Sequence, residues 1–373
     1  MDAIPALPHD AHLCLFRLSA LGDVTHMLPL VHTLRRARPD WRLTWIIGRL
    51  EHQLVGDLAG VEFIVFDKAR GWQAYRDLAR DLRGRRFDAL LQMQVALRAN
   101  VAGRLVRAPL RLGFDTARSR DGHGLFINRR VAPHPRAHVL EGFLDFATAL
   151  GIDDHDLQWN LPITQAAATF AAAHVPTDRP LLAINACTSA RLHNWRNWSA
   201  ERYAAVADHA HERHGMATVL TGGPAAAERE MARAIADRAR APVTDLVGQT
   251  SPQELAGVLA RARVAIAPDT GPAHIANAVG TPVIGLYATS NPQRTGPYRW
   301  REWCVNRYPE ALAAETGQTP EQAPEQALEQ ARWGQRVRNP EAMARITVED
   351  VTRRLDELLT AITQGAVPVA NTT

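Results

Sequence analysis

The chain has 373 residues, a formal net charge of +4 and 46% hydrophobic residues, which favours two globular domains. No apolar run is long enough to span a bilayer, and residues 1–12 lack the charged start of a signal peptide, so we expect a cytoplasmic protein. The three cysteines (Cys14, Cys187 and Cys304) are far apart, and they predict neither a disulfide framework nor a metal site.

Arginine is concentrated in the first half of the chain. Residues 70–136 contain fifteen arginines and five aspartates. A basic surface of this kind suits an anionic partner, such as a phosphorylated glycolipid, membrane headgroups or nucleic acid. The alternative is that arginine is simply the preferred cation of this protein, because Lys68 is its only lysine. No aromatic-interleaved basic ribbon and no zinc-finger spacing occurs, so we expect no nucleic-acid partner.

The first half of the chain alternates buried strands with amphipathic helices. The hydrophobic pattern predicts strands at 12–18, 41–47, 61–66, 87–93, 110–114 and 125–130, with helices from 24 onward and at 72–83, 98–106 and 141–150. This alternation predicts an α/β fold with a doubly wound, mainly parallel sheet.

The turn after the first strand carries the first candidate site. Gly22 and Asp23 stand where this strand ends and a helix begins, which is the edge where ligands bind in open α/β sheets. Asp23 is therefore a candidate general base. It is equally a candidate helix N-cap, a role that needs no substrate. The residues of this stretch alone leave both roles open.

The second half repeats the rhythm after a proline-bracketed stretch at 160–180. It predicts strands at 180–185, 217–221, 243–246, 264–267 and 282–287, and helices at 202–213, 226–240, 251–261 and 274–279. Ser251 is the expected cap of the third of these helices. We place an N-terminal domain at 1–170 and a second domain at 171–340. Two similar halves predict a cleft between them.

The last part of the chain changes character. Residues 309–340 are polar and rich in Glu, Gln and Ala, and they indicate an exposed helix or a mobile insertion. A final amphipathic helix is expected at 347–362, with Thr347 as its cap, followed by a loose tail. We treat 341–373 as a third segment.

The strongest local motif is Pro268-Asp269-Thr270-Gly271-Pro272-Ala273-His274. A strand leads into it and a helix leaves it, so Gly271 and the N–H groups of the first helical turn form an anion site suited to phosphate or pyrophosphate. Thr270 and His274 can add side-chain donors. The alternative is an ordinary capped helix after a strand.

Two further loops follow strands of the second half. The first loop contains Thr188, Ser189 and Arg196, and its guanidinium would pair with a nucleotide diphosphate and with charge developing on a departing phosphate. The alternative is a solvated arginine packing on a tryptophan. The second loop places Gly222 before Glu228 and Glu230, and either carboxylate could bind ribose hydroxyls or simply favour the helix dipole.

Together these motifs resemble glycosyltransferase family 9, the family of ADP-heptose:lipopolysaccharide heptosyltransferases. The resemblance runs from about Cys14 to Tyr298 over four separated motifs: SALGDVTHMLPLV, ARLHNWRNWSAERYA, TGGP and APDTGPAHIANAVGTPVIGLYATSNPQRTGPY. It implies a GT-B architecture, in which two Rossmann-like domains face a central cleft and the second domain holds the nucleotide sugar. The final helix would then pack back toward the N-terminal domain.

The family resemblance also implies roles for individual residues. Asp23 would be the general base of an inverting, metal-independent transfer, and a helix N-terminus would keep it ionised. Gly22 and His26 of the first motif are candidate acceptor contacts. Arg120 is a further candidate from the basic region at 98–136, where no family motif is matched. Arg196 stands where the family usually has lysine, and it is a candidate catalytic and donor-binding cation. The other candidate donor contacts are Thr188, Ser189, Gly222, Glu228 or Glu230, Asp269, Thr270, Gly271 and His274.

The resemblance further implies that heptose passes from ADP-heptose to an anionic glycolipid, the inner core of lipopolysaccharide, without a cofactor or metal. We expect a monomer in peripheral contact with the inner membrane surface. One alternative is a related enzyme with another nucleotide sugar or another acceptor. The other is a non-catalytic protein that binds a nucleotide sugar.

Overall fold

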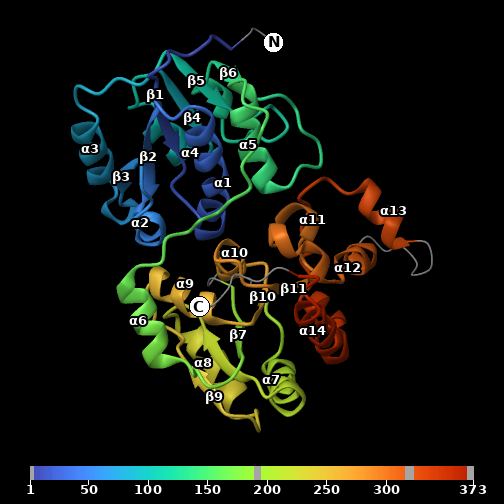
Figure 1. The fold of residues 1–373 in the computed structure, drawn as a ribbon. Helices are drawn as coiled ribbons and strands as arrows, with labels where there is room; N and C mark the ends of the chain where they lie inside the picture. Colours follow the sequence, from blue (N-terminus) through green and yellow to red (C-terminus); the bar gives the residue numbers. More distant parts are fainter. Residues whose placement is uncertain (1–3, 189–194, 316–322, 368–373) are drawn as a thin grey trace. The chain divides into compact units, whose positions relative to one another are not determined.

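The computed structural model describes residues 4–188, 195–315 and 323–367. The chain divides into two compact units, Met1–Pro162 and Ile163–Thr373, and each contains its own parallel sheet (Figure 1). None of the described helices is long and apolar enough to cross a membrane.

The first unit is a doubly wound α/β body. Its strands are β1 (His12–Phe16), β2 (Arg42–Gly48), β3 (Val61–Phe66), β4 (Ala89–Gln92), β5 (Leu110–Gly113) and β6 (Arg129–Arg130). Its helices are α1 (Leu21–Ala37), α2 (Arg49–Val55), η1 (Lys68–Arg70), α3 (Trp72–Asp81), α4 (Leu97–Gly103), η2 (His123–Leu125) and α5 (Val139–Ala149). All the described strand pairs are parallel, in the order β3-β2-β1-β4-β5-β6.

Alternation along β1 builds the two faces of this first sheet. Cys14 and Phe16 belong to a buried cluster with residues of α3 and α4, including Leu78 and Ala102. Leu13 and Leu15, which are also buried, point to the other face because neighbouring strand residues alternate. The amphipathic helices on the two faces therefore bury the central strands of the sheet, as the hydrophobic runs of these strands predict, whereas the edge strands β3 and β6 stay partly exposed.

The second unit repeats this plan. Its strands are β7 (Leu181–Asn185), β8 (Ala217–Thr221), β9 (Val243–Asp245), β10 (Val264–Pro268), β11 (Val283–Tyr287) and β12 (Val305–Asn306). Its helices are α6 (Gln165–His174), α7 (Ala200–His214), α8 (Ala226–Ala236), α9 (Pro252–Arg261), α10 (Gly271–Ala278), α11 (Pro292–Thr295), η3 (Tyr298–Trp303), α12 (Tyr308–Glu315), α13 (Ala323–Gln330), η4 (Ala342–Arg345) and α14 (Val348–Thr363).

The strand orders of the two sheets match. The second sheet runs β12-β11-β10-β7-β8-β9, so in both sheets the first strand lies beside the fourth. In each sheet, the direction in which the strands are added reverses at this pair, and the loops at its carboxyl end diverge. The turn with Asp23 follows β1, and the loops with Arg196 and Asp269 follow β7 and β10. The candidate residues therefore lie at the switch points of the two sheets.

The two compact units divide after Pro162, slightly before the expected boundary at 170. Helix α6 belongs to the second unit because it packs against α9, and because the Thr164 N–H donates to Gln253 Oε1 at 3.1 Å. Residues 125–130, expected as one strand, contain the end of η2, three loop residues and the short β6. The predicted caps Ser251 and Thr347 are confirmed, since their hydroxyls accept the N–H groups of Glu254 and Asp350.

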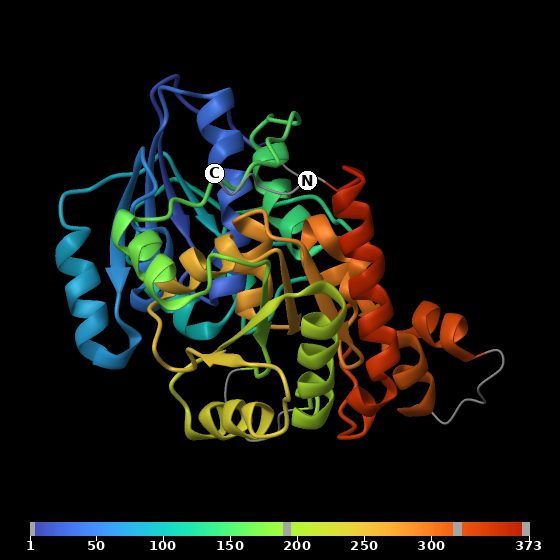
Figure 2. The ribbon, with the colours of Figure 1, turned by 60° about the horizontal axis from the view of Figure 1, so that its bottom comes forward.

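The described residues of 309–340 have more buried side chains than their polar composition predicts. In α12 Tyr308 and Leu312 are buried, and farther along Val337 is buried as well, so the described part of this segment is not a simple exposed insertion. Helix α14 packs along α7 within the second unit (Figure 1, Figure 2). Its expected contact with the N-terminal domain stays a prediction.

Candidate active site

Asp23 is the third residue of α1, and the helix cap is Ala20. The carboxylate of Asp23 reaches back and accepts the N–H of Ala20 at 3.2 Å, so it satisfies one of the unpaired donors at the helix start. The expected capping role is therefore present, but Asp23 fills it from the first turn and not from the cap position. Its side chain is 29% exposed and can still meet a ligand.

Arg17, the residue after β1, holds the carboxylate of Asp23. Its guanidinium forms a close ion pair with Asp23 Oδ2. The other terminal nitrogen donates to the carbonyl of Met93 at 2.6 Å, and the guanidinium lies 5.3 Å from the centre of the Phe143 ring. Contacts with the end of β4 and with α5 thus hold the partner of Asp23. The motifs did not reveal this pair, although Arg17 directly follows the strand that leads to Asp23.

The turn before α1 is fastened to the neighbouring strand. Gln94, which follows β4, accepts the N–H of Leu18 at 2.7 Å, and its amide donates to Ser19 Oγ at 3.3 Å. A buried carboxyl, Glu51 of α2, lies in the field of Arg17 and Asp23, and burial raises its pKa. Neither residue belongs to a motif, so the sequence carried no signal for them beyond their position after a strand.

Two expected acceptor contacts lie inside the first unit. Gly22 is buried in the first turn of α1. His26 exposes only 2% of its surface, and its ring packs edge-on against His138, the cap of α5, at 5.3 Å between centroids. This burial favours a packing role for His26 between α1 and α5. A contact of either residue with an acceptor stays a prediction.

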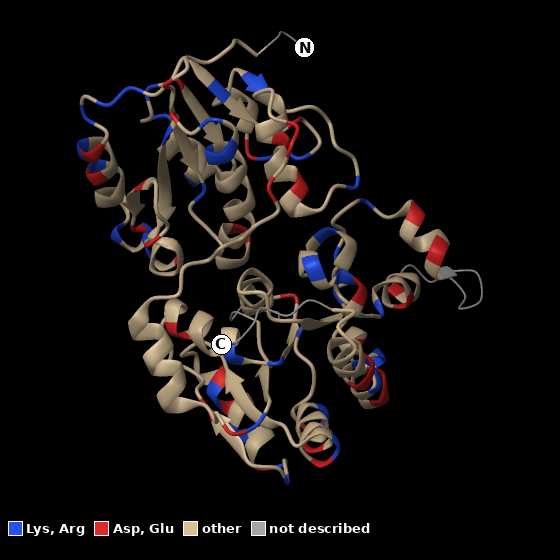
Figure 3. Ribbon diagram, in the orientation of Figure 1, with Lys and Arg blue, Asp and Glu red and all other residues tan. Residues whose placement is uncertain are grey.

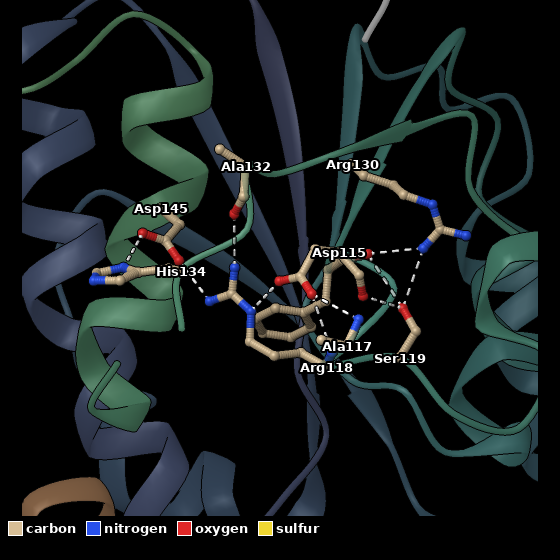
Figure 4. A network of polar contacts seen from close by, with 9 residues as sticks. Asp115, Ala117, Arg118, Ser119, Arg130, Ala132, His134 and Asp145 are labelled. Carbon is tan, nitrogen blue, oxygen red and sulfur yellow. Dashed lines mark hydrogen bonds and ion pairs between the residues drawn. The ribbon is translucent and has the colours of Figure 1, made fainter. Parts of the chain in front are cut away.

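The loop between β5 and α5 is organised by Arg118 (Figure 4). Its guanidinium pairs with Asp115, with Asp145 at 2.5 Å, and with the carbonyl of Ala132 at 3.0 Å. His134 approaches the other oxygen of Asp145 at 2.9 Å. The arginine-rich stretch is therefore partly structural, because the guanidinium of Arg118 is paired with carboxylates of the same unit.

Other arginines of the first unit remain available to a partner. Figure 3 shows basic positions on the loops that flank the first sheet. Arg98 and the candidate acceptor residue Arg120 are exposed, and no ion pair joins either of them to another described residue. Exposed arginines without an acidic partner suit an anionic ligand.

In the second unit, Asp269 and Arg196 form the centre of the candidate donor site. Asp269 is 7% exposed, and its carboxylate accepts the Ser290 hydroxyl at 2.8 Å. Arg196 Nη1 donates to the backbone carbonyl of Asp269 at 2.6 Å and lies 3.7 Å from its carboxylate. The carboxylate of Asp269 therefore faces Arg196 and Ser290, which suits a positioning role more than a direct contact with an anionic donor.

The anion site predicted at the start of α10 has the expected backbone. Thr270 is the helix cap, and Gly271 and Pro272 open the helix, with only Asp269 between the end of β10 and the cap. The N-terminal end of a helix attracts negative charge. His274 lies in the first turn and is 7% exposed. Thr270, Gly271, Asp269 and Arg196 thus come together at one end of β10.

Glu228 and Glu230 differ in what they contact. Glu228 reaches back from the first turn of α8 and accepts the N–H of Gly223 at 2.6 Å, whereas Glu230 is exposed. Gly222 leaves room for this carboxylate, because a Cβ there would lie 3.0 Å from Glu228 Oε2. Glu228 also lines a small pocket whose other walls are Ala186, Cys187, Leu220, Thr221, Ala232, Ile235 and Val247.

The loop after β7 supplies the remaining candidates. Thr188 is buried, and its N–H donates to Asn197 Oδ1 at 3.1 Å. Ser189 lies outside the described residues. Cys187 is buried, and burial, followed by the charge of Glu228, raises the pKa of its thiol to about 12, so it is neutral at physiological pH. This cysteine acts as a wall of the pocket and not as a nucleophile.

Within the described residues, one group of metal-ligand types comes together that the sequence did not reveal. His209 and His214 place Nε2 at 2.8 and 2.6 Å from Asp356 Oδ1, and Arg213 pairs with the other oxygen of Asp356. The group joins α7 to α14 at the amino edge of the sheet, the edge opposite Arg196. Its contacts are those of an ion cluster between two helices.

Comparison with known proteins identifies the family. A model described as glycosyltransferase family 9 (heptosyltransferase) matches residues 75–323. The lipopolysaccharide core heptosyltransferase OpsX of Haemophilus influenzae is 35% identical over 93% of this chain and 96% of its own length. Lipopolysaccharide heptosyltransferase 3 of Escherichia coli is 24% identical over 92% of this chain and 98% of its own.

Solved structures agree with the predicted fold class. The family 9 glycosyl transferase from Veillonella parvula has a TM-score of 0.76 and 21% identity, covering 95% of this chain and 99% of its own. The E. coli heptosyltransferase WaaC with ADP has a TM-score of 0.68 and 21% identity, covering 93% and 99%. The GT-B fold class is thereby confirmed. By the family model and the similarity to OpsX, the chain belongs to glycosyltransferase family 9, and it is a transferase enzyme.

Proposed function

We propose that the protein transfers heptose from ADP-heptose to the inner core of lipopolysaccharide. The observation that carries this proposal is the 35% identity to a lipopolysaccharide core heptosyltransferase over nearly the whole of both chains. The contacts of Asp23 in the first unit and of Arg196 in the second supply residues of the chemical types that the reaction needs. The donor sugar and the acceptor are inferred from the names of these relatives.

The donor would bind at the carboxyl end of the second sheet. The start of α10 and the guanidinium of Arg196 would hold the diphosphate, because both offer donors and positive charge. Glu228, at the edge of the small pocket, would bind the ribose hydroxyls of the donor through its carboxylate. Thr188, Ser189, Thr270 and His274 are further candidate donor contacts.

Asp23 would act as the general base. An acceptor hydroxyl would give its proton to the carboxylate while its oxygen attacks the anomeric carbon of heptose. The bond between that carbon and the diphosphate oxygen would break, and ADP would leave with the electron pair. A single attack of this kind inverts the anomeric configuration. Arg196 would stabilise the negative charge that develops on the leaving phosphate.

We also propose that turnover needs no divalent metal. The support is that the donor site already contains a fixed cation, since Arg196 is held by Asp269 through two contacts. A guanidinium can neutralise the departing diphosphate as a metal ion does in other transferases. We expect the rate to be the same in buffer with EDTA as in buffer with magnesium, and a rate that collapses in EDTA would remove this part of the proposal.

The acceptor would bind at the carboxyl edge of the first sheet. The enzyme would be a monomer that acts on the cytoplasmic face of the membrane. Four exposed apolar side chains lie on segments that follow strands β3, β4 and β5: Trp72, which is 79% exposed, Leu97, Val101 and Leu125. Contacts join these segments, because the ring of Trp72 lies 5.5 Å from that of Tyr75, whose hydroxyl donates to the carbonyl of Arg98, and the Leu97 N–H donates to Asp121. We call these four residues the apolar edge.

The chemistry of the apolar edge favours peripheral contact with an anionic membrane. Arg98 and Arg120 flank it, and neither has an ion-pair partner among the described residues. A tryptophan and leucines can enter the headgroup region while arginines contact lipid phosphates. Such contact would bring a lipid-anchored acceptor to the first unit.

The proposed function is tested by transfer itself. Purified protein is incubated with ADP-heptose and a lipopolysaccharide acceptor that lacks heptose, and the product is analysed by mass spectrometry. We expect the mass of one heptose to be added and one ADP to be released. ADP-glucose, UDP-glucose and GDP-mannose serve as competing donors. No transfer by protein that binds ADP would overturn the heptose assignment, and faster transfer from another donor would replace it.

A further inference from the structure

Residues 331–340, which follow the family-model match, contact the same edge of the second sheet as the candidate donor site. The model match ends at residue 323, and the described chain continues through α13 into residues 331–340. Two contacts fasten this stretch to the sheet. The Tyr308 hydroxyl donates to the carbonyl of Gln335 at 2.9 Å, and the Val337 N–H donates to the carbonyl of Thr289, just after β11, at 3.0 Å.

Arg336 lies between these two anchors, and its guanidinium points to Asp269. Arg336 Nη2 is 3.9 Å from Asp269 Oδ2, the oxygen that also lies 3.7 Å from Arg196 Nη1. Ser290 donates to the same oxygen. One buried carboxylate thus lies near two guanidinium groups. Together the three side chains carry a net charge of +1 beside the start of α10.

The two arginines differ in how open they are. The side chain of Arg196 is 14% exposed, whereas that of Arg336 is 45% exposed. At this distance the Arg336–Asp269 contact is a loose ion pair, and a loose, half-exposed pair contributes little to stability. Arg336 therefore has N–H groups that can bind a ligand, while its ion pair with Asp269 holds the guanidinium near the start of α10.

We propose that Arg336 is a donor-binding residue that contacts the diphosphate of the nucleotide sugar together with Arg196. This inference rests on the proposed function for the identity of the donor. A planar guanidinium can hold two phosphate oxygens at once, and a second cation matches the charge of a nucleoside diphosphate better than one. Asp269 is then the positioning residue of the pair. The segment 324–340, which lies outside the family model, would then contribute to the affinity for the nucleotide sugar.

The test is calorimetric titration of ADP, AMP and adenosine into the full-length protein and its variants. We expect Arg336→Gln to weaken ADP binding by about 10-fold, the effect of losing one charge-assisted hydrogen bond. The loss should be smaller for AMP and absent for adenosine. Arg336→Lys should recover part of the ADP affinity, because it keeps the charge but not the fork.

Arg345→Gln is the matched control. It removes the same charge from an exposed side chain outside residues 331–340, and this side chain forms no ion pair with another described residue. It should bind ADP as the wild type does. Unchanged ADP affinity in Arg336→Gln would overturn the proposal. So would an equal loss for ADP and adenosine, because that pattern marks a structural defect and not a phosphate contact.

Melting temperature and steady-state kinetics complete the experiment. If Arg336→Gln does not fold, Arg336→Lys is tested in its place. If this variant binds ADP as tightly as the wild type at every salt concentration, a bidentate contact of Arg336 with the diphosphate is ruled out. With an active donor, Arg336→Gln should raise KM more than it lowers kcat. Calorimetry with ADP needs neither heptose nor acceptor, so wild-type protein that binds ADP but transfers no heptose would overturn the proposed function and leave this inference standing.

Discussion

Arg17 and Asp23 form a close ion pair across the turn that joins β1 to α1. The pair fixes the direction of the carboxylate, since Arg17 is itself held by the carbonyl of Met93. Asp23 also accepts the N–H of Ala20. Both contacts use Oδ2, so in the proposed mechanism Oδ1 is the oxygen that would take the proton of the acceptor hydroxyl. Capping and catalysis are therefore compatible in one side chain.

The first prediction separates these two roles of Asp23. Asparagine keeps a carbonyl oxygen for the Ala20 N–H but cannot accept a proton as a base. We expect Asp23→Asn to lower kcat by about 10²- to 10⁴-fold, the usual contribution of a general base. Affinity for ADP, measured by calorimetry, should be unchanged, and the melting temperature should stay close to that of the wild type. Near-normal kcat in the folded variant would rule out the base assignment.

The second prediction concerns the two glutamates after the TGGP turn. Glu228 lines the pocket and Glu230 is exposed, so only the first is placed for a ribose contact. We expect Glu228→Gln to weaken ADP binding by about 10-fold and Glu230→Gln to leave it unchanged. Calorimetry with 2′,3′-dideoxy-ADP is the control, because the effect of Glu228→Gln should vanish when the hydroxyls are absent. A larger effect at Glu230 would reverse the assignment.

Local patterns of the sequence were sufficient to predict the fold class. Alternation along strands and helical spacing predicted both sheets, and the capping signals at Ser251 and Thr347 predicted two helix starts. These features depend on neighbours in the chain, so they can be read without a structure. The differences include α2 and β12, which were not predicted, residues 125–130, where a turn replaces most of a strand, and 309–340, whose polar composition hid the buried side chains of Leu312 and Val337.

The candidate site was predictable only in part. The motifs placed Asp23, Arg196 and Thr270 at strand ends, which is a local property. They did not reveal that Asp269 faces Arg196 and Arg336, because those contacts join residues that are distant in the chain. The burial of His26 against His138 is likewise a tertiary fact. Polar residues outside motifs, such as Gln94, carry no sequence signal of their structural role.

The third prediction tests the apolar edge as a membrane contact. The double variant Trp72→Ser, Leu125→Ser removes its two most exposed side chains. We expect its binding to vesicles of phosphatidylglycerol and phosphatidylcholine to fall by about 10-fold or more, since each apolar side chain that enters the interface contributes on the order of 1 kcal/mol. Binding should also weaken at high salt, because arginine contacts with lipid phosphate are screened. Vesicle co-sedimentation measures both effects.

A matched control for this experiment is Leu157→Ser. Leu157 is also an exposed leucine of the first unit, but it follows α5 near the end of α1, at the other edge of the sheet. Its replacement should leave vesicle binding unchanged. Turnover on a deacylated, water-soluble acceptor should be the same in all three proteins. If the double variant bound vesicles as well as the wild type does, the apolar edge would not be the membrane contact.

The fourth prediction follows from a histidine buried in the first unit. His123 is 1% exposed, and burial, followed by the positive charge of Arg130, lowers the pKa of its imidazole to about 4. The unfolded chain, with a pKa near 6.5, therefore binds a proton over a pH range in which the folded state does not. The contribution of neutral His123 is fully present above pH 6.5 and is lost as the pH falls from 6.5 toward 4.

The measurement for His123 is the unfolding free energy at several pH values. We expect the wild type to lose about 1 kcal/mol per pH unit between pH 6 and pH 5 relative to His123→Gln, because one proton separates its folded and unfolded states there. Glutamine can still donate to Asn100 Oδ1, which now lies 2.8 Å from His123 Nδ1. His9→Gln, at a residue whose side chain is 87% exposed, should keep the wild-type slope. Equal slopes for wild type and His123→Gln would mean that His123 is already protonated in the folded protein, or that water reaches it and removes the cost of burial.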